Sequence, residues 1–266
     1  MPLNRSFSQE DLSRALTELD VPREKLLVVI SDLARFGDIE HGDKSELQCY
    51  VDILQHCLGD SATLVVPTFT YNRGGPESPY IHETSISKTG ALTEYIRRLD
   101  GAVRSLHPVF SFAAIGGAAA QLCENVSQHS YGADSTAHRL FKQDAFVVAL
   151  GLPPHRGGFF IHLAEVMAGV PYRFTKELSI PVYMNGEQVE RPFFHFVKYP
   201  DADIEWDTNR LVARLDRRGL LRYRPLGASG IWAYRASDLV NTTLDLLMRN
   251  IYGLLAKPPE VRPWNA

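Results

Sequence analysis

Short, unbroken apolar runs constrain the fold of this chain more than any other feature. They occupy residues 26–30, 63–66 and 146–150, and a fourth run covers 109–115. Runs of this length without polar alternation are typical of strands buried on both faces, as in parallel or mixed sheets covered by helices. Amphipathic segments lie between them, so the sequence predicts an α/β protein.

A tight-turn signal stands in the second half of the chain. Asn185-Gly186 is the preferred pair for a two-residue hairpin, and residues 180–184 and 188–196 flank it as candidate strands. No internal repeat, low-complexity tract or linker divides the sequence. We therefore predict one domain over residues 1–266, with a β-hairpin appendage at about 179–200.

The composition is that of an ordinary globular protein. The 266 residues are 45% hydrophobic and 22% charged, with a net charge of -3. Nucleic-acid binding needs a basic face, which this charge does not favour. No apolar run reaches the length of a transmembrane helix or a secretion signal. The cysteines, Cys49, Cys57 and Cys123, read as reduced thiols, so we expect a cytoplasmic protein without nucleic-acid or membrane partners.

Small and polar residues follow two of the predicted strands. Ser31-Asp32-Leu33 ends the first strand, and residues 67–70 (Pro-Thr-Phe-Thr) end the second. Open α/β sheets bind ligands at the carboxyl ends of their strands. A glycine-bearing loop before a helix can also direct backbone N–H groups at phosphates, although a plain connection is the alternative for this loop. We expect a ligand site at this edge of the sheet.

The 146–150 strand leads to a histidine and a glutamate on one predicted helix. His162 and Glu165 lie three residues apart and project from the same side of that helix. An imidazole has a reference pKa near 6.5 and accepts protons at neutral pH. The pair can serve as a base and a carboxylate toward one substrate, while an ordinary polar helix face is the alternative.

Five segments carry a resemblance to a known family. In chain order they are 67–70, 84–94, 104–116, 131–135 (Tyr-Gly-Ala-Asp-Ser) and 162–165 (His-Leu-Ala-Glu). Together, from about residue 10 to the end, they resemble the aminoglycoside 3-N-acetyltransferase family, also called the antibiotic N-acetyltransferase family. The resemblance implies a three-layer α/β/α sandwich with a mixed, mostly parallel central sheet, unlike the GNAT fold. It also implies acetyl-CoA as donor, no metal, and a primary amine of an amino sugar or aminocyclitol as acceptor.

The resemblance also implies roles for individual residues. His162 would be the general base for the attacking amine, and Glu165 would orient the imidazole or hold the substrate ammonium. The residues expected to contact acetyl-CoA are Ser31, Asp32, Leu33, Thr68, Phe69 and Ser111. Those expected to face the acceptor are Glu83, His107, Asp134, Phe159 and Phe160. For His107, a hydrogen bond inside its own turn is an equal alternative, and for Glu83 and Asp134 the alternative is a solvated acid in a loop.

Several positions depart from the family pattern. Asp32 stands where a serine is usual and His41 where a glycine is usual, and an aspartate repels a pyrophosphate unless it points away. Phe159 and Phe160 replace small hydroxyl residues, which predicts a narrower or more apolar pocket. Because the net charge is only -3, we expect a less cationic amino sugar as the acceptor.

Two other functions stay open from the sequence alone. Ser111, His162 and Glu165 are residue types of a hydrolase triad, although no G-x-S-x-G elbow surrounds any serine. A member that binds a CoA ester or amino sugar without turnover is the second, suggested by the altered loop at 31–33. The remaining histidines considered, His138, His155 and His195, are interpreted as surface or structural. A homodimer is the assembly that we consider beside a monomer.

Overall fold

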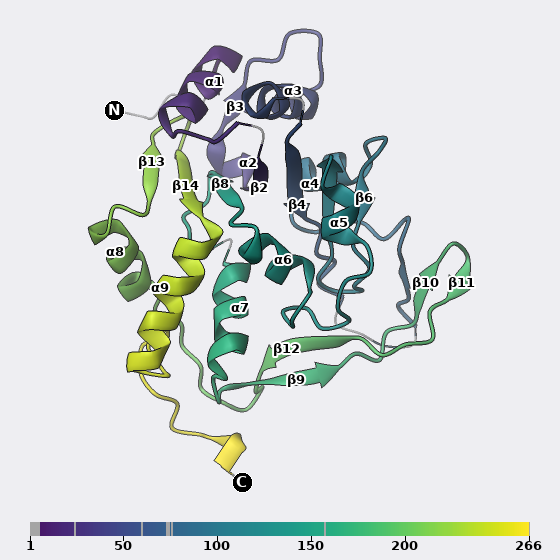
Figure 1. The fold of residues 1–266 in the computed structure, drawn as a ribbon, viewed down its shortest axis with the longest axis vertical. Helices are drawn as coiled ribbons and strands as arrows, with labels where there is room; N and C mark the ends of the chain where they lie inside the picture. Colours follow the sequence, from purple (N-terminus) through teal and green to yellow (C-terminus); the bar gives the residue numbers. More distant parts are fainter. Residues whose placement is uncertain are drawn as a thin grey trace.

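The fold is built on one central sheet of seven strands (Figure 1). The structure, a computed structural model, describes residues 6–23, 25–59, 61–72, 75, 77–156 and 158–265. Across the sheet the strands run in the order β13 (Arg222–Arg224), β14 (Ile231–Arg235), β8 (Phe146–Leu150), β2 (Leu26–Ser31), β4 (Thr63–Pro67), β7 (Phe112–Gly116) and β6 (Val103–Arg104). The apolar runs near 26–30, 63–66 and 146–150 thus form its centre, as predicted.

The sheet is mixed, but the prediction that it is mostly parallel is wrong. Only β2 pairs in parallel, with β4 on one side and β8 on the other. The other four of the six pairings are antiparallel. An apolar run indicates that a strand is buried on both faces, but it does not indicate the direction of the strand. The antiparallel pairing of β7 with β4 could therefore not be predicted from the sequence. That strand also begins later than predicted, at Phe112.

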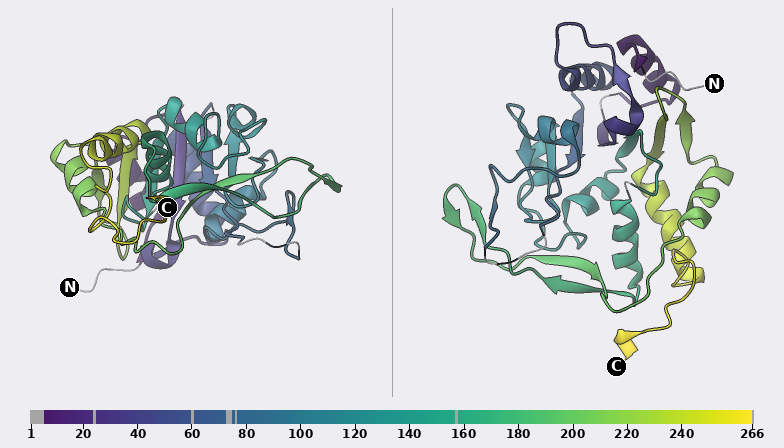
Figure 2. Two further views of the ribbon diagram at one scale, coloured as in Figure 1. Left: turned by 90° about the horizontal axis from the view of Figure 1, so that it is seen from below. Right: turned by 180° about the vertical axis from the view of Figure 1, so that it is seen from behind.

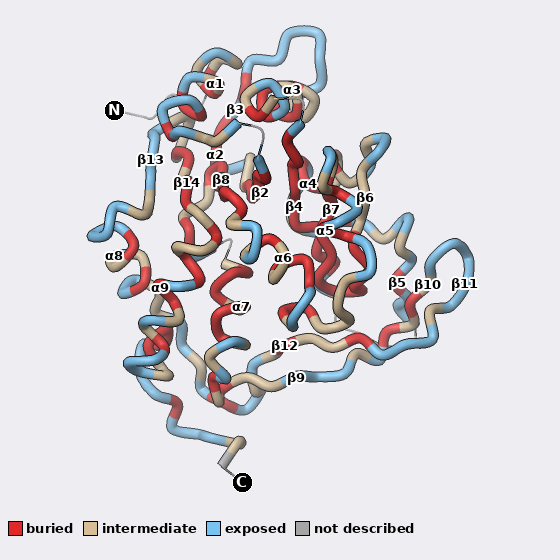
Figure 3. Tube along the Cα trace, viewed as in Figure 1, coloured by how far each residue is buried: buried red, intermediate tan, exposed pale blue. Residues whose placement is uncertain are grey.

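Helices pack against both faces of the sheet, and alternate residues of β2 belong to two separate cores. In Figure 3 the colour for buried residues runs along the central strands β4 and β8. Leu27 and Val29 join the core that includes α1, α3 and α4, while Val28 and Ile30 join the core of α5 to α9. The helices are α1 (Gln9–Glu18), α2 (Leu33–Phe36), α3 (Glu46–Leu58), α4 (Ala91–Arg97), α5 (Ala119–Cys123), α6 (Thr136–Lys142), α7 (Phe159–Ala168), α8 (Asn209–Arg217) and α9 (Ala236–Arg249), with a final 3-10 turn at Pro263–Asn265. No helix of the described ranges is long and apolar enough to cross a membrane.

Local signals explain where these helices begin and end. Ser8 caps α1 through a reciprocal capping box with Asp11. Ser45 caps α3 by accepting the backbone N–H of Gln48. The last α-helix, α9, ends at Arg249, because the backbone is extended at Asn250.

A two-stranded ribbon and a hairpin extend along one side of the molecule (Figure 2). The ribbon pairs β9 (Arg173–Glu177) antiparallel with β12 (Phe194–Lys198), and the hairpin pairs β10 (Val182–Met184) with β11 (Glu187–Gln188). The hairpin turns at Asn185 and Gly186, whose φ values are 54° and 81°. β10 also pairs in parallel with β5 (Tyr80–Ile81), and β1 (Ser6–Phe7) pairs with β3 (Asp38–Ile39). The single strand expected over 188–196 is therefore two strands with different partners.

Gly151 lets two strand ends approach one another. Its φ is 74°, and a Cβ atom there would lie 2.5 Å from the carbonyl oxygen of Asp32. The turn after β2 and the loop after β8 can therefore meet only because residue 151 has no side chain. α7 follows in the chain and begins at Phe159.

Candidate active site

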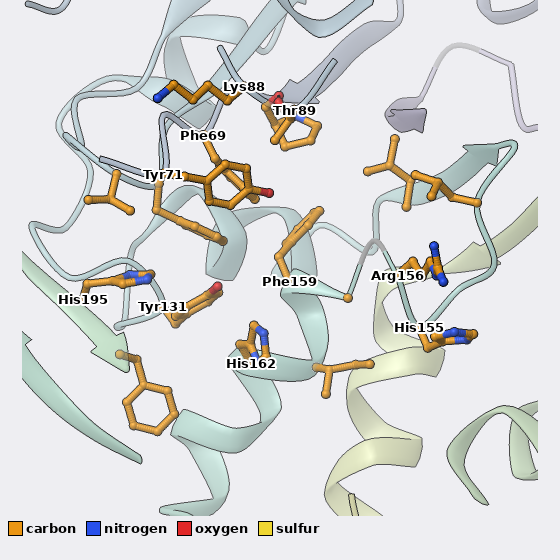
Figure 4. A pocket seen from close by; sticks show the side chains of 18 of the residues that line it. Phe69, Tyr71, Lys88, Thr89, Tyr131, His155, Arg156, Phe159, His162 and His195 are labelled. Atoms are coloured by element: carbon orange, nitrogen blue, oxygen red, sulfur yellow. The ribbon is translucent and has the colours of Figure 1, made fainter. Parts of the chain in front are cut away.

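A cavity of about 600 Å³ opens where the parallel strands β2, β4 and β8 end (Figure 4). Ser31 and Pro67 contribute from the first two strands, and Leu152 follows the third. The N-terminal half of α7 and residues of the β9–β12 ribbon supply other parts of the wall. The predicted ligand edge and the cavity therefore coincide, because the three parallel strands place their carboxyl ends together.

His162 lies at the cavity and is hydrogen-bonded to a buried carboxylate. Its Nδ1 is 2.6 Å from Oε2 of Glu165, whose side chain is fully buried. A carboxylate accepts a hydrogen bond, so Nδ1 carries the proton and Nε2 keeps its lone pair. The side chain of His162 is 31% exposed and lines the cavity. The one-turn spacing of the two residues on α7 produces this contact.

Arg173 completes the arrangement from the start of β9. Its Nε lies 3.0 Å from Oε2 of Glu165, and its Nη1 donates to the carbonyl oxygen of Phe196 at 3.4 Å. A buried carboxylate needs such a partner, since leaving one charge unpaired in the interior is strongly destabilising. The contacts from Arg173 to Glu165 and from Glu165 to His162 therefore hold the His162 ring in place.

The surroundings keep His162 neutral at physiological pH. Withdrawal from water and the positive charge of Arg173 lower the pKa of His162, while the bond to Glu165 raises it and does not prevail. A neutral imidazole is the form that accepts a proton. Trp206 lies edge-on to the same ring, with centroids 5.6 Å apart, and its own ring is 5.1 Å from the Arg173 guanidinium carbon.

Only some of the residues predicted to hold acetyl-CoA reach the cavity. Ser31 and Phe69 line it. The hydroxyls of Thr68 and Ser111 are fully buried and lie 2.9 Å from one another, and Ser111 also receives a bond from Nε of Arg104. No hydrogen bond of the described residues joins Ser111 to His162, so a hydrolase triad is not assembled.

The loop after Ser31 is occupied by its own contacts. Asp32 accepts the backbone N–H of Arg35 and forms an ion pair with that side chain, 3.1 Å from Nε. Leu33 packs against the core on the other face of the sheet. The backbone N–H groups of residues 32, 35, 36 and 37 are bonded to carbonyl oxygens. Four of the backbone N–H groups that this loop could direct at phosphates are therefore already bonded within the protein, which agrees with the alternative of a plain connection.

The predicted acceptor residues are also divided. Phe159 lines the cavity, whereas Phe160 is fully buried in the core. Both ring nitrogens of His107 bond to backbone, Nδ1 to the N–H groups of Val109 and Phe110 and Nε2 to a carbonyl, which is a structural role. The two predicted acids lie outside the cavity lining: Asp134 is paired with Arg139 at 2.7 Å, and Glu83 accepts the N–H of Asn185.

Several cavity residues were not predicted from the sequence. His155 and His195, interpreted as surface or structural, both line the cavity, together with Tyr71, Lys88, Tyr131, Arg156, Arg173 and Trp206. Burial lowers the pKa of His195 to about 3, and its Nδ1 has no hydrogen-bond partner among the described residues. A strand over residues 188–196 was predicted to include His195. The pairing of β12 with β9 carries no signature in a single sequence.

The chain matches known proteins over most of its length. The model of the family "Aminoglycoside 3-N-acetyltransferase" matches residues 28–248. Aminoglycoside N(3)-acetyltransferase IV of Salmonella sp is 28% identical over 260 residues, which cover 96% of this chain and 92% of that protein. Aminoglycoside N(3)-acetyltransferase IX of Micromonospora chalcea is 28% identical over 273 residues, which cover 92% and 93%.

Solved structures agree with these matches. The crystal structure of the aminoglycoside acetyltransferase AAC(3)-IVa apoenzyme superposes with a TM-score of 0.75 at 25% identity and covers 97% of this chain and 95% of that one. The binary complex of AAC-IIIb with CoASH gives a TM-score of 0.77 at 19% identity, covers 96% of this chain and 100% of that one, and shows a common fold. On the family match above all, this chain belongs to the aminoglycoside 3-N-acetyltransferase family.

Proposed function

We propose that this protein is an acetyl-CoA-dependent N-acetyltransferase that acts on a primary amine of an amino sugar, aminocyclitol or related small molecule. The observation that carries the proposal is His162, held through Nδ1 by a buried Glu165 and turned to a cavity at the strand ends. The family membership supports it. A mutant of the aminoglycoside acetyltransferase AAC(3)-IVa, 25% identical to this chain, has been solved in complex with apramycin.

The proposed mechanism is direct attack in a ternary complex. Acetyl-CoA, when bound, supplies an acetyl group activated as a thioester. His162 accepts at Nε2 the proton that the amine nitrogen loses as its bond to the acetyl carbon forms. Glu165 stabilises the imidazolium that results, and Arg173 keeps the carboxylate in place. The proton then leaves His162 with the departing thiol, which returns the imidazole to its neutral form.

The cavity rim fits a donor that carries phosphates. Lys88 and Arg156 are exposed at the cavity and form no ion pair with any described residue. Free cationic side chains of this kind bind phosphate groups. Asp32 does not oppose them, because its carboxylate is engaged by Arg35. We therefore assign Ser31, Lys88 and Arg156 to the cosubstrate.

The finer description of the fold is part of the same proposal. Helical cores on both faces of a mixed sheet support a three-layer α/β/α sandwich, and residues 1–266 would form one domain with the hairpin near 179–200 as an appendage. The three cysteines are unpaired, in keeping with a reducing cytoplasmic location. The homodimer stays a prediction.

Thiol release from acetyl-CoA tests the function. The protein should release CoA thiol only when a suitable amine is present, and calorimetry should detect acetyl-CoA binding without amine. Absence of binding at millimolar ligand would overturn the proposal. A stoichiometric burst of thiol without amine would favour the hydrolase instead, and binding without turnover across a broad amine panel would favour the non-catalytic member.

A further inference from the structure

The cavity wall contains no carboxylate in the parts of the chain that the structure describes. Three cationic side chains line it, those of Lys88, Arg156 and Arg173. Arg173 is neutralised by Glu165, which lies behind His162 and is fully buried. The other two have no ion pair among the described residues. The cavity therefore presents neutral or positive groups to whatever enters it.

Aromatic rings gather on one side of the cavity, where Lys88 also lies, opposite Arg156 (Figure 4). Figure 4 shows Tyr71, Tyr131 and His195 on one side of Phe159, and His155 and Arg156 on the other. Phe110 also lines the cavity, with its ring centroid 4.4 Å from that of Tyr131. If the side of Arg156 and His155 receives the phosphates of the donor, the aromatic side receives the acceptor, and Lys88 there adds a positive charge beside it.

A polycation is poorly matched to this aromatic side. Each ammonium group that leaves water without a carboxylate partner loses its hydration and gains no ion pair. The face of an aromatic ring can attract one nearby cation. This attraction is weak compared with the hydration free energy that several ammonium groups would lose. The phosphates of the donor do not supply the missing acids, since Lys88 and Arg156 would already neutralise them.

We infer that the acceptor of this enzyme carries a single amino group on a body with a flat apolar face, and no further ammonium group. The inference rests on the proposed acetyltransferase function and specifies its substrate class. The amine reaches His162 in its neutral form, while the flat face stacks on Tyr131 and Phe110. A monosaccharide amine and an arylalkylamine both have this chemistry.

The first test compares kcat/KM across three acceptors by thiol release. Glucosamine represents the sugar monoamine, phenylethylamine the arylalkylamine, and gentamicin the polycation. We expect at least one monoamine to exceed gentamicin by roughly tenfold or more, the factor that one poorly paired polar group commonly costs. The better of the two monoamines identifies the body that the aromatic side prefers. Equal or faster turnover of gentamicin would overturn the inference and leave the acetyltransferase function standing.

A charge-matched pair of variants provides the second test. Tyr71 is 57% exposed at the cavity rim and has a φ of 49°, a conformation that suits Asp and Asn better than other residues. Tyr71→Asp should raise the kcat/KM ratio of gentamicin to monoamine several-fold, whereas Tyr71→Asn, equal in size but uncharged, should not. An equal change in both variants would contradict the role given to charge.

The two levels of the proposal fail separately. If no amine at all is acetylated, the acetyltransferase function falls. The inference about the acceptor can then still be tested by measuring the affinity of the same three amines by calorimetry. Tighter binding of gentamicin than of both monoamines would overturn it. Monoamine binding that exceeds gentamicin binding would keep it for a non-catalytic member.

Discussion

His162 is held by one carboxylate and opposed by one cation, and both act on its proton. Glu165 accepts from Nδ1 at 2.6 Å, while the guanidinium of Arg173 lies 3.0 Å from the same carboxylate oxygen. Orientation and protonation state of the imidazole therefore depend on two residues that need not touch the substrate. Substitutions of His162, Glu165 and Arg173 should therefore have different effects on kcat and on the pH profile.

Loss of the imidazole should abolish most turnover without disturbing donor binding. We expect His162→Ala to lower kcat by at least roughly a hundredfold, the usual scale for a general base. Acetyl-CoA affinity measured by calorimetry should change little, since the assigned phosphate contacts are elsewhere. His56→Ala, an exposed residue of α3, serves as the control. Retention of most activity in the His162 variant would show that the base is another group.

Substitution of Arg173 and substitution of Glu165 should shift the pH profile of kcat/KM in opposite directions. The positive charge of Arg173 lowers the pKa of His162, so Arg173→Met should move the acid limb of kcat/KM to higher pH. Glu165 raises the pKa of His162, so Glu165→Gln should move the limb to lower pH and also reduce kcat through lost orientation. Full pH–rate profiles of both variants measure this. Shifts of the same sign would contradict the electrostatic account.

The sequence predicted the His162–Glu165 contact but not its third member. A spacing of three residues on a helix is sufficient to place two side chains together. Arg173 lies beyond the end of α7 and returns to Glu165 only through the turn at 169–172. His195 comes from a different strand altogether. Such contacts depend on tertiary geometry, and no local pattern encodes them.

Among the elements, α7 carries both His162 and Glu165, and a left-handed glycine ends it. Gly169 has a φ of 64°, and a Cβ there would meet no atom within 4 Å. The cost of a side chain at this position is therefore conformational and not steric. The register of the turn that leads to Arg173 depends on this residue.

Substitution of Gly169 should separate these effects. We expect Gly169→Ala to lower the free energy of unfolding by about 1 kcal/mol, and Gly169→Asn to cost less because asparagine tolerates left-handed backbone. Urea unfolding of the two variants and the parent measures the difference. Equal costs for Ala and Asn would point to a packing effect in place of a backbone one.

For helices and strands, the sequence predicted which strands are buried better than it predicted which strands pair with one another. The central strands β2, β4 and β8 were predicted within one residue of their observed bounds. The direction of β7 and the division of 188–196 between β11 and β12 were not. Apolar content determines whether a strand is buried, whereas pairing depends on residues far away in the chain.

For the whole molecule, buried neutral histidines should make stability depend on pH. Burial lowers the pKa of His107 from 6.5 to about 4 and that of His195 to about 3. The unfolded chain therefore binds more protons between these values and 6.5, and stability is complete above 6.5 and lost as the pH falls. For His107 the difference corresponds to roughly 3 kcal/mol.

Urea unfolding at a series of pH values tests this. The free energy of unfolding should fall steadily from pH 7 to pH 4, and His107→Asn should have a shallower dependence although it is less stable at neutral pH. An unchanged free energy of unfolding over that interval would mean that the two rings gain protons in the folded protein as easily as in the unfolded chain.

The cavity brings together segments that are far apart in the chain, between Ile30 and Thr208. Parallel strand ends could be predicted to meet, and they do. The aromatic side could not be predicted, because Tyr71, Tyr131 and His195 belong to separate loops and strands.

Trp206 gives the protein a built-in optical reporter. Its indole lies 5.6 Å from the His162 ring and 36% of the residue is exposed, so any change of charge or solvent at the cavity should alter its fluorescence. The chain has only three tryptophans. Trp232 packs on Tyr223 and Trp264 on Tyr199. With these two replaced by phenylalanine, emission from Trp206 alone would follow the filling of the cavity in real time, without a label and without turnover.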